Sequence, residues 1–272
     1  MDAMTKRKTV GLALGSGGTR GCAHVGVIKA LVENNIPIDY ISGCSIGAWV
    51  AACYGLYRNV NVLAEYTVGS RWEKFYSFLE AGRSGGIIKG DRMEKLLDEW
   101  LQHKTFEDLK IPVKMISVDL VKGERVILDS GPLGSAVRRS MSIPALFKPV
   151  QDGERILVDG GVADPVPDGI VRDMGADVVV AVNLDDFQKA TWFNKESLSI
   201  KSIVARTAEI SRHHLAEYSL TDADVVIRPP VMKYTQWREY FWREQGSNIE
   251  KAGYDATLDK ILEIKTLIAQ SS

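Results

Sequence analysis

The sequence predicts an α/β fold in three layers, α/β/α, with a mostly parallel central sheet between two layers of helices. Short apolar segments alternate along the chain with longer segments of helical pattern, and this alternation is typical of parallel βα units. The segment 178–182 is apolar at every position, as expected for a strand buried on both faces of a sheet. Two glycine-rich turns each follow an expected strand and precede an expected helix, which favours the same arrangement.

The expected strands are short apolar runs, and the last of them is predicted to lie at an edge of the sheet. They comprise residues 10–14, 38–42, 113–120, 125–128, 156–158, 178–182 and 225–227, with 113–120 and 125–128 as a possible pair. The expected helices comprise residues 23–33, 46–57, 91–102, 134–141, 166–174, 200–220 and 236–269, the last interrupted near Gly246. We expect a catalytic domain over residues 8–230 and a C-terminal helical segment, 231–272, packed on the same domain.

Length, charge and cysteine content narrow the class of protein. A chain of 272 residues is long enough for one large domain with a proper core. The formal net charge is −1, so no basic field attracts nucleic acid, and we expect no nucleic-acid partner. Cys22, Cys44 and Cys53 are too few and odd in number for a disulfide framework, which favours a reduced, cytoplasmic location. The sequence has no apolar run long enough to span a bilayer, and peripheral contact with the inner membrane surface stays open.

Ser45 is the candidate nucleophile. It is the centre of Gly43-Cys44-Ser45-Ile46-Gly47, a G-x-S-x-G pattern in which a serine stands on a tight turn between a strand and a helix. A second match surrounds Ser84, but it follows a helix-like stretch and does not open a helix, so Ser45 is preferred. The alternative for Ser45 is a helix N-cap, a position that serine favours in any protein.

The glycine-rich loop from Gly15 to Gly21 follows the first expected strand and suits two kinds of site. A dinucleotide site needs G-x-G-x-x-G, but Arg20 stands at the third glycine position and Asp39 precedes the second strand instead of ending it. An oxyanion hole needs exposed backbone N–H groups, and consecutive glycines supply them. We therefore favour the oxyanion hole, with a purely structural turn as the remaining alternative.

Asp159 is the candidate base, because no histidine is well placed for that role. His213 and His214 fall in the middle of a helical pattern and are predicted to be solvated, while His24 and His103 are expected to be buried with a partner or exposed. Asp159 directly follows the expected strand 156–158, at the edge where sites form in α/β sheets. A turn at the Asp-Gly dipeptide is the alternative. No histidine or cysteine pair has metal-ligand spacing, so neither a metal nor another cofactor is expected.

Together these motifs resemble the patatin-like phospholipase family, in particular its bacterial branch, which is similar to the catalytic domain of neuropathy target esterase. The resemblance covers roughly residues 8–185 and includes the block Ser142 to Pro149 that precedes the family's aspartate. It implies a patatin-like fold, a Ser45–Asp159 dyad and phospholipid or lysophospholipid substrates. The implied oxyanion hole consists of Gly17, Gly18 and Thr19, and the supporting motif residues are Gly15, Arg20, Gly21, Gly43, Gly47, Gly160 and Gly161. One departure is Asp164, where members of the family often carry asparagine.

Two aromatic stretches are candidates for contact with a lipid surface. Trp192 and Phe193 lie in a polar, loop-like segment, whereas Tyr234, Trp237 and Phe241 have helical spacing, which favours core packing for them. The rival functions to a lipid esterase are a nucleotide-binding module built on the glycine loop and a non-catalytic adaptor at a membrane. The sequence does not indicate an oligomeric state, a head group or an acyl-chain preference.

Overall fold

A computed structural model describes residues 7–69, 80, 85–185, 198–232 and 243–270. In this part of the chain the central sheet has eight strands in the order β10-β9-β1-β2-β4-β8-β7, with β5 paired to β4. Their bounds are β1 (Val10–Leu14), β2 (Tyr40–Cys44), β4 (Val113–Asp119), β5 (Glu124–Leu128), β7 (Val150–Asp152), β8 (Arg155–Asp159), β9 (Val178–Val182) and β10 (Val225–Ile227). β10, β9, β1, β2 and β4 pair in parallel, which confirms the mostly parallel sheet.

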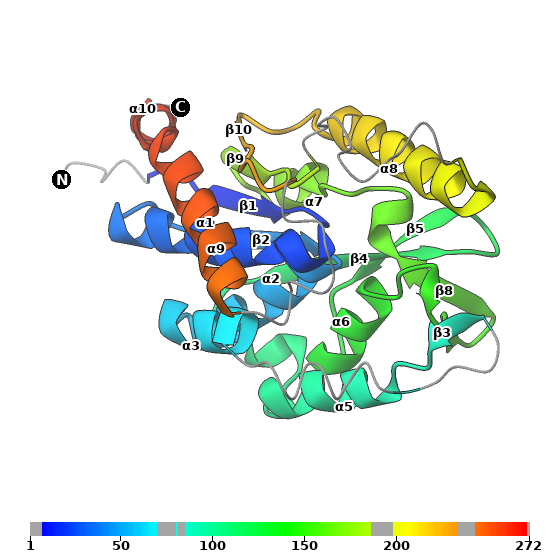
Figure 1. The fold of residues 1–272 in the computed structure, drawn as a ribbon. Coiled ribbons are helices and arrows are strands. Elements are labelled where there is room, and N and C mark those ends of the chain that lie inside the picture. The colour runs from blue at the N-terminus through cyan, green and yellow to red at the C-terminus, as the bar shows by residue number, and fades with distance from the viewer. Residues whose placement is uncertain (1–6, 70–79, 81–84, 186–197, 233–242, 271–272) are drawn as a thin grey trace.

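Helices cover both faces of this sheet, as Figure 1 shows. They are α1 (Cys22–Glu33), α2 (Ile46–Tyr57), α3 (Val60–Ala64), α5 (Asp91–Trp100), α6 (Leu133–Ser140), α7 (Asp168–Asp173), α8 (Ile200–Ser219), α9 (Arg243–Leu258) and α10 (Ile261–Ala269). Alternate side chains of β1 show the two sides: Leu12 packs into the larger core with α1 and α2. Ala13 packs into a second core with α7 and Ala216 of α8. The sheet is therefore buried on both faces, as the apolar segment 178–182 predicted.

The antiparallel strands lie on one side of the sheet, beyond β4. β5 and β8 both pair with β4 in antiparallel register, and β7 pairs with β8. The pairing of residues 113–120 with 125–128 is thereby confirmed, and so is the edge position of β10. A separate two-stranded sheet joins β3 (Gly86–Ile88) to β6 (Ala145–Phe147). The sequence did not predict β3, β6 or β7, each only three residues long.

α9 crosses α1 in close backbone contact. A Cβ atom on Gly26 would lie 1.9 Å from the carbonyl oxygen of Glu250, and one on Gly253 would lie 2.0 Å from that of Ala23. Only glycine allows so close an approach, so the two helices are locked together. The division into residues 8–230 and 231–272 stays a prediction. The expected interruption near Gly246 is wrong, because Gly246 lies inside α9 and the helix ends at Leu258.

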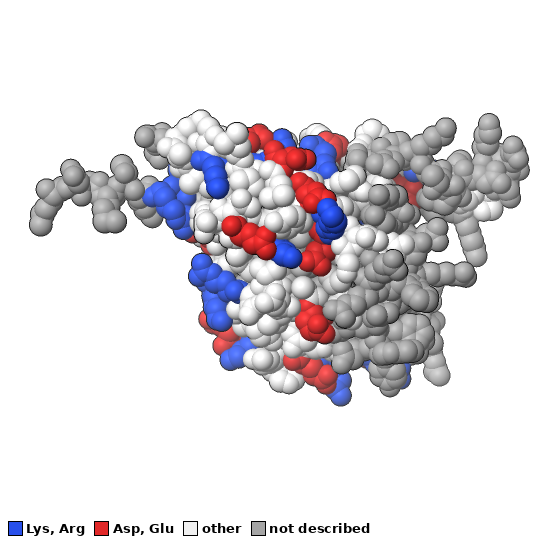
Figure 2. Space-filling view, turned by 60° about the vertical axis from the view of Figure 1, so that its left-hand side comes forward, with Lys and Arg blue, Asp and Glu red and all other residues white. Residues whose placement is uncertain are grey.

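Charge is mixed on the side of the molecule that lies to the left in Figure 1. Figure 2 shows acidic and basic side chains interspersed over the described residues of that face, in keeping with a formal net charge of −1. Within the described ranges, none of the helices has the length and apolar character that crossing a bilayer requires.

Candidate active site

Ser45 stands on the turn between β2 and α2 in a backbone conformation that is rare for a side-chain-bearing residue. Its φ is 56° and its ψ is −120°, and its side chain is almost fully buried. The flanking glycines permit this turn. A Cβ on Gly43 would lie 2.5 Å from the carbonyl oxygen of Gly47, and a Cβ on Gly47 would lie 2.1 Å from that of Leu14. Although Ser45 occupies the N-cap position of α2, its side chain makes no capping hydrogen bond.

A second serine, Ser140 at the end of α6, holds the backbone of this turn. The N–H of Ser45 donates to Ser140 Oγ at 2.9 Å, and Ser140 Oγ in turn donates to the carbonyl oxygen of Ile116 at 2.7 Å. Sequence reasoning did not identify Ser140, since nothing in the sequence pattern links it to residue 45. The bond fixes the direction in which the Ser45 side chain leaves the chain.

Asp159 reaches the same place from the opposite direction. It is the last residue of β8, and it pairs with Ser117 of the antiparallel strand β4. The preceding residue of β4, Ile116, pairs with Cys44 of β2, so Asp159 lies level with Ser45. Asp159 therefore lies near the other motifs, as expected, but the strand that brings it there is antiparallel. β8 is not one of the parallel strands whose carboxyl ends share an edge.

The two carboxylate oxygens of Asp159 have different surroundings. Oδ1 accepts hydrogen bonds from the Gly161 N–H at 2.8 Å and from the Cys44 thiol at 3.9 Å. Oδ2 is buried and has no hydrogen-bond partner among the described residues. Burial raises the pKa of Asp159 to about 6, against the smaller lowering effects of the Ser45 hydroxyl and the Gly161 N–H. A carboxylate with a raised pKa and one unsatisfied oxygen is a stronger base than an exposed aspartate.

The glycine-rich loop presents its backbone amides next to this pair. The N–H of Ser16 donates to the carbonyl oxygen of Pro165. None of the described residues accepts a hydrogen bond from the amides of Gly17, Gly18 or Thr19. These residues line the same cavity as Ser45 and Asp159. Gly18 has a φ of 55°, a conformation that glycine adopts without strain. Amides without an acceptor among the described residues, next to a serine, are the kind of donors that an oxyanion hole requires.

Arg20 anchors the loop to the end of β9. Its fully buried guanidinium donates to the carbonyl oxygens of Gly17 at 3.0 Å and Leu184 at 2.7 Å, and to Asp185 Oδ1 at 2.7 Å. The residue of the loop that packs closely against α2 is the next one, Gly21, where a Cβ would lie 2.1 Å from a side-chain carbon of Ile46. The arginine at the third position of the glycine pattern therefore has a structural role in this chain.

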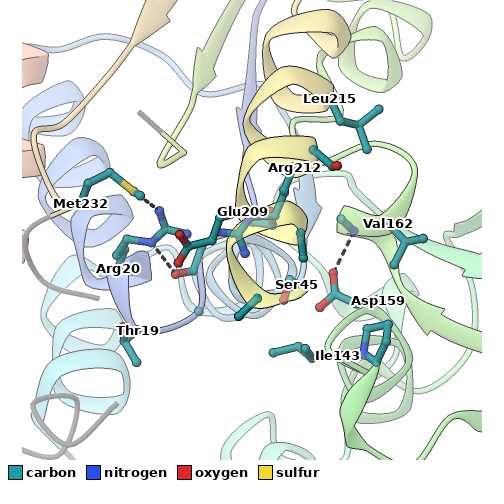
Figure 3. A pocket seen from close by; sticks show the side chains of 18 residues that line it. Thr19, Arg20, Ser45, Ile143, Asp159, Val162, Glu209, Arg212, Leu215 and Met232 are labelled. Atoms are coloured by element: carbon teal, nitrogen blue, oxygen red, sulfur yellow. Dashed lines mark hydrogen bonds between the residues drawn. The ribbon is translucent and has the colours of Figure 1, made fainter. Parts of the chain in front are cut away.

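The cavity at Ser45 has a volume of about 570 Å³ and is formed by segments far apart in the sequence. Figure 3 shows Ser45 and Asp159 facing it, with Arg212, Glu209 and Leu215 of α8 along one wall. Its lining residues are Ser16, Gly17, Gly18, Thr19, Arg20, Ser45, Ile143, Pro144, Asp159, Gly161, Val162, Ala205, Ala208, Glu209, Ser211, Arg212, Leu215 and Met232. Sequence reasoning missed the wall supplied by α8.

None of the four histidines is among the described residues that line the cavity. His24 is fully buried behind the loop, where its Nε2 donates to the carbonyl oxygen of Gly15 at 2.8 Å and burial lowers its pKa to about 4. His103 lies beside Asp98. The prediction that His213 is solvated is wrong. His213 is half-buried, and its Nδ1 lies 2.8 Å from the carbonyl oxygen of Asp185.

Asp164, the departure from the family pattern, forms an ion pair with Arg125. Its Oδ2 accepts from Arg125 Nη1 at 2.9 Å, while burial is the largest cause of the raised pKa of Asp159. Cys22, Cys44 and Cys53 are buried, and they form no disulfide within the described residues. The described residues contain no group of three or more side chains suited to holding a metal ion.

Several sequence predictions fall outside the described residues, so the structure does not bear on them. These are the second serine motif at Ser84 and the aromatic residues Trp192, Phe193, Tyr234, Trp237 and Phe241.

Comparison with known protein families shows to which family the chain belongs. Residues 12–170, more than half of the chain, match the family described as Patatin-like phospholipase. The chain belongs to the patatin-like phospholipase family. Membership of this family supports a lipid esterase or phospholipase activity. The resemblance of the motifs is thereby confirmed.

The relatives also match the predicted branch. An uncharacterised NTE family protein of Mycobacterium bovis is 34% identical over 177 residues, which cover 65% of this chain and 49% of that protein. Human patatin-like phospholipase domain-containing protein 6 is 32% identical over 65% of this chain and 13% of its own length. The Drosophila melanogaster neuropathy target esterase sws is 28% identical over 83% of this chain and 18% of its own length. The chain thus spans about half the length of the mycobacterial relative.

The fold has a counterpart among solved structures. The crystal structure of VipD from Legionella pneumophila superposes with a TM-score of 0.63 over 94% of this chain and 67% of that chain, at 14% sequence identity. At this identity the likeness shows the fold alone. It confirms the predicted patatin-like α/β architecture.

Proposed function

We propose that this chain hydrolyses acyl esters of lipids with Ser45 as nucleophile and Asp159 as base, as a phospholipase A or lysophospholipase. The observation that carries the proposal is Oδ2 of Asp159, which is buried without a hydrogen-bond partner among the described residues, in the cavity that also contains Ser45. A lone buried carboxylate oxygen costs free energy unless it has a function or a transient partner. Family membership supports the same chemistry.

In the proposed reaction, Ser45 Oγ attacks the carbonyl carbon of the ester while Asp159 takes the hydroxyl proton. The developing oxyanion accepts hydrogen bonds from the amides of Gly17, Gly18 and Thr19, and the positive end of α2 adds to its stabilisation. Asp159 then gives the proton to the departing alcohol as the acyl–enzyme forms. Water, activated by Asp159, attacks the acyl group and releases the fatty acid, which restores Ser45.

The decisive experiment combines a lipid panel with active-site labelling. Wild type should hydrolyse phospholipid or lysophospholipid and should react covalently with a fluorophosphonate, whereas Ser45→Ala should do neither while remaining folded. A labelled Ser84, or an active Ser45→Ala protein, would contradict the assignment. Failure to label any serine would favour a non-catalytic adaptor, and nucleotide binding by the unlabelled protein would favour the nucleotide module.

We also propose that the protein is cytoplasmic and contacts the inner membrane surface peripherally through α8. The first half of this helix exposes apolar side chains beside the cavity: Ile200 is 83% exposed, Val204 61% and Ile203 47%. Such an apolar face next to the cavity suits a lipid surface. Ile200→Ser with Val204→Ser should weaken binding to phosphatidylglycerol vesicles and spare hydrolysis of a soluble short-chain ester. Leu262→Ser, at a 77% exposed position of α10, is the control and should change neither.

A further inference from the structure

Arg212 brings a partly exposed cation into the cavity of Ser45. It lies on the wall formed by α8 and points toward the interior of the cavity (Figure 3). Its side chain is 37% exposed, whereas that of its ion-pair partner, Asp185, is only 4% exposed. The Nη2 atom of Arg212 lies 2.8 Å from Asp185 Oδ1. One edge of the guanidinium is thus held by the protein, and solvent still reaches part of the group.

Arg212 shares its ion-pair partner with another arginine, because Asp185 has two cationic neighbours. Arg20 Nη2 donates to the same oxygen, Oδ1, at 2.7 Å, and a single carboxylate carries one negative charge for two guanidinium groups. Glu209, the other acidic residue of this wall, pairs with Arg206 at 3.0 Å. Of the two guanidinium groups that share Asp185, Arg212 is the more exposed, with 37% of its side chain accessible against 5% for Arg20.

The ion pair with Asp185 is made by Nη2 and does not use the Nε donor of Arg212. A guanidinium has five N–H donors in a planar fork, which matches two oxygens of a phosphate group. Arg212 Nε is buried and has no hydrogen-bond partner among the described residues. Arg20, by comparison, uses its donors on two carbonyl oxygens as well as on Asp185. Among the described lining residues, Arg212 is therefore the cation that is exposed enough to bind a further anion.

We propose that Arg212 binds the phosphate of the lipid head group while the acyl ester lies at Ser45, so that the site selects phosphate-bearing glycerolipids over neutral glycerides. This inference rests on the proposed function. In a glycerophospholipid only the glycerol backbone separates the ester from the phosphate, so both groups fit in one cavity of about 570 Å³. Apolar side chains such as Ile143 and Val162 form another part of the lining and suit the acyl chain.

The test compares two esters with the same acyl chain, a lysophosphatidylglycerol and a monoacylglycerol, both below their micelle-forming concentrations. For Arg212→Gln, the ratio of kcat/KM for the phosphate-bearing ester to that for the neutral ester should fall about 10- to 100-fold, the size of one charged hydrogen-bonding partner. Most of the change should lie in KM. For Arg212→Lys this ratio should lie between those of wild type and Arg212→Gln, because lysine keeps the positive charge but lacks the planar pair of N–H donors. Arg228→Gln is the control: Arg228 pairs with Glu217 of α8 outside the described lining of the cavity and should leave the ratio unchanged.

A ratio within threefold of wild type for Arg212→Gln would overturn the inference, even if both activities fell together. Such a joint loss would assign Arg212 to support of Asp185 or Asp159. A binding measurement separates this outcome from failure of the proposed function. Ser45→Ala should bind the lysophosphatidylglycerol in calorimetry, and adding Arg212→Gln should weaken that binding by a similar factor whether or not the enzyme is active. If inorganic phosphate bound as tightly as the lipid, the site would be one for free phosphate and the head-group proposal would be wrong.

Discussion

Ser140 Oγ accepts the backbone N–H of Ser45 at 2.9 Å. The contact matters because Ser45 has a φ of 56°, and a side-chain-bearing residue held in such a region costs about 1–3 kcal/mol unless its surroundings fix it. Ser140 is itself oriented by the carbonyl oxygen of Ile116. The end of α6 and strand β4 thus jointly hold Ser45, the proposed nucleophile, in its strained turn.

Ser140→Ala should therefore lower kcat about tenfold and leave KM nearly unchanged. The substitution leaves the Ser45 N–H buried without an acceptor, a loss of about 1–3 kcal/mol, and lets the turn relax away from Asp159. Steady-state kinetics on a soluble ester and urea denaturation measure the two effects. Ser117→Ala is the matched control, because the Ser117 hydroxyl donates to the Val158 carbonyl oxygen and not to the turn. Full activity of Ser140→Ala would show that the bond has no role in catalysis.

The pH dependence of kcat/KM should have an acid limb near pH 6. Asp159 accepts a proton only as the carboxylate, and burial raises its pKa to about 6, so activity should fall as the pH drops through that value. A histidine of ordinary pKa, near ~6.5, would titrate in almost the same range. Temperature separates the two, since carboxyl ionisation has little enthalpy and imidazole ionisation is strongly endothermic. An acid limb that moves markedly between 10 and 35 °C, roughly as an imidazole does, would count against Asp159.

The two glycine-rich turns of the site were predictable from the sequence, because the residues that form each turn are neighbours in the chain. The bounds predicted for β1 and α2 agree with the structure, Val10–Leu14 and Ile46–Tyr57, because the glycines of each turn fix where strand and helix meet. Asp159 was identified from the strand before it, yet the direction of β8 was wrong. Strand direction depends on pairing with β4, and the three-residue apolar run 156–158 does not encode which neighbouring strand it pairs with or in which direction.

The rest of the site arises from contacts between distant segments, which no local pattern records. Ser140 and Arg212 lie far along the chain from Ser45, and each was interpreted only as part of a helix. Gly246 illustrates the opposite error. It was predicted to interrupt a helix, but it lies within α9 close to Val68, where a Cβ would come within 2.9 Å of a methyl carbon. Glycine at this position is explained by the close packing against Val68 and not by a need for an unusual backbone conformation.

The histidines should be dispensable for proton transfer. His24 is buried with a pKa lowered to about 4, so it stays neutral and donates to the carbonyl oxygen of Gly15. His24→Ala should lose about 1–3 kcal/mol of stability from this buried bond, whereas His24→Gln keeps a donor and should retain most activity. His103→Ala and His214→Ala should remain within about twofold of wild type. A folded histidine variant that lost about 10³-fold in kcat, the scale of a missing triad member, would replace the dyad with a triad.

The loop amides should be sensitive to bulk at Gly17. A Cβ there would lie 2.7 Å from Leu184 Cδ1, so Gly17→Val must displace either the loop or Leu184. Turnover should fall about 10²-fold or more, as for the loss of one oxyanion donor, and Gly18→Val should do the same because the φ of Gly18 is 55°. Leu184→Ala added to Gly17→Ala should recover part of the activity by removing the clash. Full turnover in both folded valine variants would remove the loop from the mechanism.

Asp159→Asn should abolish hydrolysis and yet stabilise the fold at alkaline pH. The pKa of Asp159 is raised from 3.8 to about 6 by burial, so between those values the native state binds more protons than the unfolded state. Stability supplied by the protonated carboxyl is therefore complete below about pH 4 and is lost as the pH rises through 6. A buried amide avoids this loss, so the variant should be more stable than wild type at pH 8, by up to about 3 kcal/mol.

Urea denaturation at pH 8 and at pH 4.5 measures this difference, and the advantage of Asp159→Asn should shrink at the lower pH. Asp168, whose pKa burial also raises to about 6, titrates in the same window, so only the difference between variant and wild type is diagnostic. Ser45→Ala is the control. It removes a hydroxyl that lowers the pKa of Asp159, so the pH dependence should persist and become slightly steeper. If Asp159→Asn were destabilised equally at both pH values, the carboxylate would be a structural partner. Burial of the charged carboxylate would then not lower the stability of the wild-type protein.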